Sequence, residues 1–166
     1  MKRLLVPAMA VLFLACCAGA PRVVSYYVDR GVMQYFLMPS RFHAGDAGLS
    51  IDFAIRVEAD QGEPAICNFT IKAKKDLPRA IRRAYFRLLD TGGEVELHAI
   101  AVLFIERLDK EIRITSTMEA ADFRRLLHSR EVTLSVESDA GEYIFNPARG
   151  FYNTIRDAGI EIIDES

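Results

Sequence analysis

Two glutamates and a histidine stand at alternate positions of one segment, and their side chains could do chemistry together. Glu94, Glu96 and His98 have the parity of a β-strand, so an extended backbone would direct all three to one face. Carboxylates and an imidazole can hold a divalent metal ion, or catalyse by acid and base if one pKa is raised. These are the weak catalytic candidates. The same face continues with apolar residues from Ile100 onward, and the spacing matches no metalloenzyme signature, so no metal site is predicted.

The sequence lacks the patterns that mark the common enzyme classes. Gly-x-Ser-x-Gly, Ser-x-x-Lys and His-Glu-x-x-His are absent, as are the Gly-rich and Walker-type phosphate loops. His43 is expected in a loop, and His128 is expected at a helix C-terminus, where an imidazolium is favourable. A non-enzymatic protein that needs no cofactor is therefore favoured.

Basic side chains are concentrated between residues 72 and 87, which hold seven lysines and arginines against a single aspartate. The apolar residues between 77 and 88 recur at helical spacing, which predicts a helix with the arginines opposite its apolar stripe. An exposed aromatic among arginines suits an anionic lipid, a glycan or an acidic protein, while an ordinary solvated face is the competing interpretation. The predicted binding residues are Arg79, Arg82, Arg83 and Phe86.

Aromatic residues are concentrated near the start of the predicted domain. Tyr26, Tyr27, Tyr35 and Phe36 lie in two expected strands. They can form strand core, a membrane-proximal contact surface or a ligand-facing wall. A pocket of roughly 300 Å³ or more lined by Tyr27, Tyr35 and Phe36 would indicate a small-ligand carrier.

The elements that must position these residues follow from periodicity and turn residues. Strands are expected over residues 23–28, 32–38, 49–58, 65–73, 94–108, 111–117, 132–137, 142–145 and 160–163, and residues 39–48 are expected to form a loop. Helices are expected from about residue 77, from a Ser116/Glu119 capping box and from Asn146-Pro147 to Gly159. Because residues 99–105 are apolar on both faces, their strand is expected at the centre of the sheet.

The predicted fold class is α+β, with a mainly antiparallel sheet and about three helices packed on one face or end. A β-sandwich with peripheral helices is the alternative. Residues 23–166 would form one globular domain. The hydrophobic content of 51% argues against disorder, and the formal charge of −2 gives no reason to expect a nucleic acid.

The first residues have the pattern of an export signal. Lys2 and Arg3 give a positive start, and Leu4–Ala15 is an apolar run of twelve residues. That run is too short to span a hydrocarbon core of roughly 30 Å, so we expect its removal. Ala18-Gly19-Ala20 fits ordinary secretory cleavage, but this cut would leave Pro21 first, and its ring fits an extended protease subsite poorly.

The segment Phe13-Leu14-Ala15-Cys16 resembles the lipobox of bacterial lipoproteins, and the resemblance is confined to residues 1–16. Phe13 departs from the aliphatic residue of that family's pattern. Taking Cys17 as the modified residue restores Leu14 at that place, but it puts Cys16 where a small residue belongs. The resemblance implies a signal peptide over residues 1–15, lipidation at Cys16 and a tether over residues 16–22. Because no aspartate follows Cys16, it also implies the outer membrane.

The third cysteine, Cys67, has two open interpretations. With Cys16 lipidated, Cys17 and Cys67 can pair in an oxidising compartment. The apolar surroundings of Cys67 instead favour a small buried side chain.

These observations predict a lipid-anchored protein of the bacterial cell envelope. Its partners would be a membrane, through the N-terminal lipid, and another envelope protein, an anionic lipid or a glycan. The domain would be a non-enzymatic binding or structural module. The alternatives are a soluble periplasmic small-ligand carrier and, less favoured, a hydrolase that acts on envelope polymers through Glu94, Glu96 and His98.

Overall fold

The computed structural model describes residues 21–29, 31–58, 63–74, 77–106, 108 and 110–163. These residues form ten strands and two helices. The predicted signal peptide and the predicted lipidation site at Cys16 lie outside the described residues.

The strands belong to one antiparallel sheet. They are β1 (Val23–Asp29), β2 (Val32–Ala44), β3 (Ala47–Glu58), β4 (Ala65–Ala73), β5 (Ile81–Leu88), β6 (Glu94–Glu96), β7 (His98–Glu106), β8 (Glu111–Met118), β9 (Val132–Ser138) and β10 (Gly141–Pro147). Their order is β6-β5-β9-β10-β2-β3-β4-β8-β7, and β1 pairs with β2 outside this path. The two-residue alternation along β3 places Leu49, Ile51, Phe53 and Ile55 in the core, as its sequence predicts.

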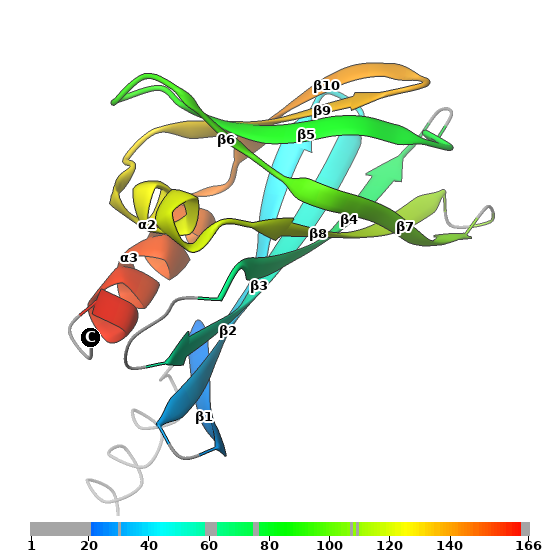
Figure 1. Cartoon of the computed structure of the whole chain (residues 1–166). Helices are drawn as coiled ribbons and strands as arrows, with labels where there is room; N and C mark the ends of the chain where they lie inside the picture. The colour runs from blue at the N-terminus through cyan, green and yellow to red at the C-terminus, as the bar shows by residue number, and fades with distance from the viewer. Residues whose placement is uncertain are drawn as a thin grey trace, which may run out of the picture.

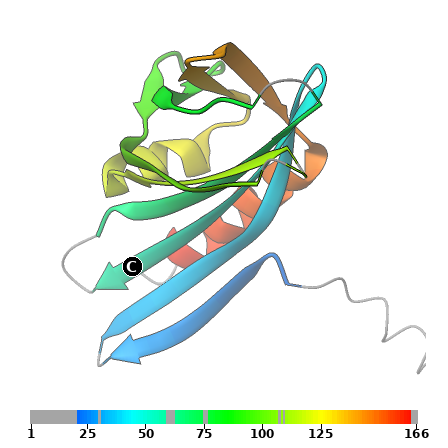
Figure 2. The same cartoon turned by 90° about the vertical axis from the view of Figure 1, so that its right-hand side faces the viewer.

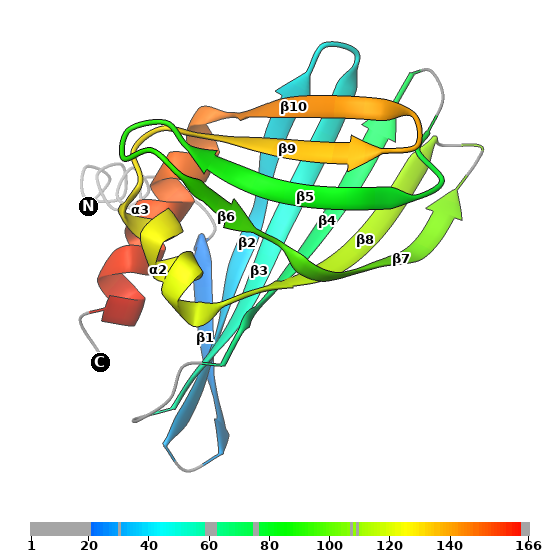
Figure 3. The same cartoon turned by 45° about the horizontal axis from the view of Figure 1, so that its top comes forward.

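The sheet folds over on itself into two layers. β5, β6, β9 and β10 form an upper layer that crosses the strands beneath it (Figures 1 and 3). The layers join through a short pairing of β10 with β2, where Asn146 faces His43 and Pro147 faces Phe42. β6 and β7 are the two ends of the strand order, yet only Leu97 separates them in the chain. The sheet is therefore nearly closed around its core.

Phenyl rings from both layers meet in the core. Phe42 of β2 and Phe86 of β5 are fully buried, and their ring centroids lie 6.4 Å apart. Phe151 packs edge-on against Phe42 at 4.9 Å and stacks on Phe86 at 6.4 Å. Contacts of this kind stabilise beyond the burial of their area, by about 0.5–1.5 kcal/mol each.

Two helices close one end of the layers. α2 (Ala120–His128) buries Phe123, Leu126 and Leu127, and α3 (Arg149–Ile163) packs against α2 and β2. Figure 2 shows α3 on the far side of the long strands. A helix is therefore present where the sequence predicts one after Glu119.

The predicted α+β class is wrong: the described residues form a mainly-β fold with two helices. The decisive error concerns the segment expected to be a helix from about residue 77, because residues 81–88 form β5. The apolar residues there fit both periods, since Ala84, Phe86 and Leu88 point inward at a spacing of two. The alternative of a β-sandwich also fails, because hydrogen bonding continues from one layer into the other.

Three boundaries also differ from the prediction. β2 continues through the expected loop to Ala44, with Pro39 at a register shift where a missing N–H is tolerated. The capping box is wrong: Ser116 lies in β8 and donates to the Cys67 carbonyl at 3.2 Å. α3 runs past Gly159 to Ile163, so the expected last strand is absent from the described residues.

Cys67 is a free thiol that is fully buried in β4. Burial, and secondarily the charge of Asp52, raises its pKa far above the ordinary thiol value. The role of a small buried side chain is confirmed, and the thiol is unreactive in the folded state because it is not ionised.

We expect Ser135→Ala to raise the free energy of unfolding by about 1 kcal/mol, because Ser135 Oγ is buried and has no hydrogen-bond partner among the described residues. The matched control is Ser138→Ala. Ser138 Oγ donates to the Gly141 carbonyl at 2.8 Å and accepts from the Ala140 N–H at 3.1 Å, so its loss should cost about 1 kcal/mol. Urea unfolding of both variants measures the difference. Equal destabilisation by the two substitutions would contradict this account of Ser135.

Candidate functional site

The three catalytic candidates are all exposed. Glu94 and Glu96 point outward from β6, and His98 is exposed at the start of β7. Arg83 binds both carboxylates, at 3.0 Å from Glu94 and 3.1 Å from Glu96. Among the described residues, no group of three or more His, Cys, Asp or Glu side chains is placed to hold a metal ion. The geometry therefore gives no support to the hydrolase alternative.

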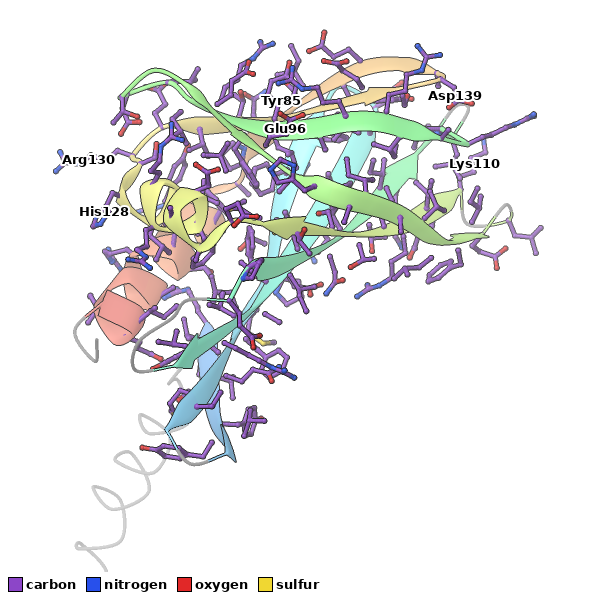
Figure 4. All side chains as sticks on the ribbon, in the orientation of Figure 1. Tyr85, Glu96, Lys110, His128, Arg130 and Asp139 are labelled. Carbon is purple, nitrogen blue, oxygen red and sulfur yellow. The ribbon has the colours of Figure 1, made fainter. Side chains whose placement is uncertain are left out.

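Arg83 belongs to a charge network on the outer face of the upper layer, where Figure 4 labels Tyr85 and Glu96. The guanidinium lies over the Tyr85 ring, 4.2 Å from its centroid, and 3.9 Å from Glu137. Arg87 donates to Tyr85 Oη at 2.7 Å. The hydrogen bond to Glu96 raises the pKa of Arg83 above its ordinary value. Since its members are about 40% exposed, each pair stabilises little, but together they neutralise these arginines.

The predicted binding residues do not form the expected surface. Arg79 and Arg82 are exposed, whereas Arg83 is held by the glutamates. Phe86 is fully buried because the strand directs it inward. Phe86 is thus not an exposed aromatic side chain between these arginines. A binding role for Arg79 and Arg82 stays a prediction.

The aromatic residues that could form one ligand-facing wall do not lie together on one face. Tyr35 is buried in the core, while Tyr27 and Phe36 are exposed to solvent. Alternation along β2 sends Tyr35 and Phe36 to opposite faces of the sheet. These residues therefore do not line one pocket, which removes the observation that a small-ligand carrier requires.

Two open hollows lie elsewhere on the described surface. One, of about 670 Å³, lies between the end of α2 and α3 and is lined partly by His128, Arg130 and Arg156. Figure 4 shows His128 and Arg130 at this end of the molecule. Ser129 also lines this hollow, and its Oγ donates to the Asp90 carboxylate. The other hollow, of about 390 Å³, lies beside Asp46, Lys74 and Tyr143.

The most distinctive surface is β7, the last strand of the lower layer (Figure 1). Its second edge pairs with no strand among the described residues. Four consecutive large apolar side chains on it, and Leu108 just beyond, are exposed: Val102 39%, Leu103 54%, Phe104 47%, Ile105 40% and Leu108 92%. A free strand edge with such a run is a site at which other chains can bind. We name Val102–Ile105 with Leu108 the β7 strip.

The sequence signal on β7 was present, but its interpretation was wrong. Residues apolar on both faces predict a central strand, whereas β7 is an end strand with only β8 beside it. The expected single strand over residues 94–108 breaks at Leu97, and Ala99 has a φ of 49°, which redirects the chain away from β5. Successive side chains of a strand point to opposite faces, and two register shifts distort β7 against β8, so apolar side chains are exposed on both of its faces. An unbroken apolar run can therefore belong to a distorted edge strand.

Comparison of the chain with protein-family models, with curated proteins and with solved structures finds no match. Among the described residues, no helix is long and apolar enough to cross a membrane.

Asp139 should control part of the acid sensitivity of the fold. Its Oδ1 accepts from the N–H groups of Ala80 and Arg79, at 3.2 and 2.9 Å, and these bonds hold its pKa below the ordinary value. Because the folded pKa is lowered, this stabilisation is present above the unfolded pKa, about 3.9, and is lost as pH falls through the folded value. Between about pH 5 and pH 2, the melting temperature of Asp139→Asn should therefore fall less than that of the unsubstituted protein.

Asp90 gives an independent comparison, since Ser129 Oγ and the Arg130 N–H lower its pKa in the same way. Asp90→Asn should likewise reduce the fall in melting temperature over this pH range, and the double variant should reduce it further. Thermal unfolding as a function of pH checks both. If the melting temperature of the double variant fell with pH as steeply as that of the unsubstituted protein, these two carboxylates would not be the source of the acid sensitivity.

Proposed function

We propose that this protein is a lipid-anchored component of the bacterial cell envelope, and that its domain is a non-enzymatic binding module for another envelope protein. The observation that carries the binding role is the β7 strip. Large exposed apolar runs on a free strand edge are unfavourable in water and promote association, so proteins usually cover or charge them. Here the run is uninterrupted by charge from Ala99 to Ile105.

The partner that fits the strip is an extended apolar segment. Unpaired backbone groups of β7 can hydrogen-bond to such a segment, and Phe104 and Ile105 offer it side-chain contacts. The register shifts limit the hydrogen-bonded ladder to short stretches. Side-chain burial therefore supplies most of the affinity. His98 precedes the uncharged apolar run of residues 99–105 and Glu106 follows it, and Leu108 lies just beyond.

The anchor would contribute through concentration. Each buried methylene of an acyl chain stabilises membrane binding by about 0.8 kcal/mol, so a cysteine with two or more chains stays on the membrane. Confinement to one surface raises the effective concentration of the module near its partners. A modest apolar strip is then sufficient for binding.

Phe104→Asp should weaken the contact about tenfold, because a half-exposed phenyl group loses its apolar partner and a carboxylate is buried instead. The measurement is the yield of the protein–protein adduct from a photo-cross-linker at Leu103 in intact membranes. Leu89→Asp is the matched control: Leu89 is 51% exposed, but it follows β5, away from the strip. Equal adduct yields from the two variants would refute binding through β7.

The anchor is tested by the intact mass of the protein recovered from bacterial membranes. We expect the mass of residues 16–166 plus a diacylglyceryl or triacyl group. An unmodified chain that begins at Pro21 and stays in the soluble fraction would exclude the anchor.

A further inference from the structure

The hairpin of β1 and the first half of β2 projects from the body of the domain (Figures 1 and 3). β1 pairs with β2 and with no other strand among the described residues. Large apolar and aromatic side chains on and beside this hairpin are exposed: Tyr26 58%, Tyr27 82%, Val28 51%, Phe36 38%, Met38 44% and Ile66 45%. This second exposed apolar surface is separate from the β7 strip.

The register shows how these side chains are arranged. Phe36 faces Val24 on one side and Ala54 on the other, and Ala54 faces Ile66, so one apolar row crosses four strands. The Tyr26 ring extends the row by packing edge-on against Phe36, with centroids 6.0 Å apart. Tyr27 points to the opposite face near the tip. Apolar side chains are therefore exposed on both faces of the hairpin. This arrangement is expected for an element that its binding medium surrounds on all sides.

The chemistry of the hairpin fits a lipid headgroup region. Tyrosine combines an apolar ring with a polar hydroxyl and is enriched at the membrane–water interface. Arg56 lies beside the row, with its guanidinium bonded to Gln34 at 3.1 Å on the exposed surface. A cation in that position can contact anionic headgroups.

The position of the hairpin in the chain brings it to the membrane. β1 begins at Val23, and seven peptide units separate it from Cys16. A fully extended chain of that length spans at most about 25 Å. β7 lies at the other end of the run β1-β2-β3-β4-β8-β7, so a bilayer that contacts the hairpin leaves the β7 strip accessible.

We propose that the β1–β2 hairpin is a membrane-contact element whose exposed tyrosines and apolar side chains enter the headgroup region of the bilayer. This inference rests on the proposed function for the location of the domain, and it adds a second contact that orients the domain on the membrane. An anchor alone would leave the domain free to rotate about its tether.

The chain contains no tryptophan, so a single introduced tryptophan reports on one position. Tyr27→Trp places it near the hairpin tip, and Leu108→Trp is the matched control on the turn after β7, at a site that is 92% exposed. The mature proteins are incorporated into vesicles of phosphatidylethanolamine and phosphatidylglycerol, with and without bromine on the acyl chains. We expect a blue-shifted emission and quenching by bromine for Tyr27→Trp, and neither change for Leu108→Trp.

Unquenched emission from Tyr27→Trp in vesicle-bound protein overturns the inference and leaves the anchor intact. Quenching of Leu108→Trp alone also overturns it, because the opposite side would then face the bilayer. The same two tryptophans in a Cys16→Ser chain mixed with vesicles separate the two proposals. Quenching at position 27 there supports membrane contact by the hairpin even if the native chain carries no lipid.

Discussion

The pairing of β5 with β9 is the interaction on which the rest of the structure depends. It makes residues 81–88 a strand, and the alternation of that strand then sends Phe86 into the core and Arg83 to the outer face. The buried ring completes the contact between the layers and α3, while the guanidinium reaches the glutamates of β6. The core and the outer charge network are thus two faces of one strand.

The same strand determines which edge is left free. β6 pairs with only the second half of β5, and beyond Leu97 the left-handed backbone at Ala99 carries the chain into the lower layer. Within the described part of the chain no pairing joins β6 to β7, so β7 has a strand partner on one edge only. The nearly closed sheet buries a continuous core, and the cost of incomplete closure is an apolar strand in contact with water. Exposed surface of this kind is usually retained for association.

Several side chains of the types suited to chemistry already have partners in the structure. Glu94 and Glu96 both pair with Arg83, and Glu94 also lies 3.7 Å from Arg87, so each carboxylate already has a cationic partner. Ser129 is hydrogen-bonded to a carboxylate, and Cys67 is a buried, un-ionised thiol. Large apolar side chains are instead exposed on the β7 strip and on the β1–β2 hairpin.

The sequence by itself determined most strands, because alternation along β3 or β8 reflects which face meets the core. It also favoured a small buried side chain at Cys67, because the residues around it are apolar. Tertiary structure alone decided the state of residues 77–88, whose apolar residues fit both a helix and a strand until β9 supplied hydrogen bonds. It also decided whether residues 99–105 were central or at an edge, since apolar faces are common to both. Local patterns specify which side chains avoid water, whereas strand neighbours, set by contacts distant in sequence, decide which of them are covered.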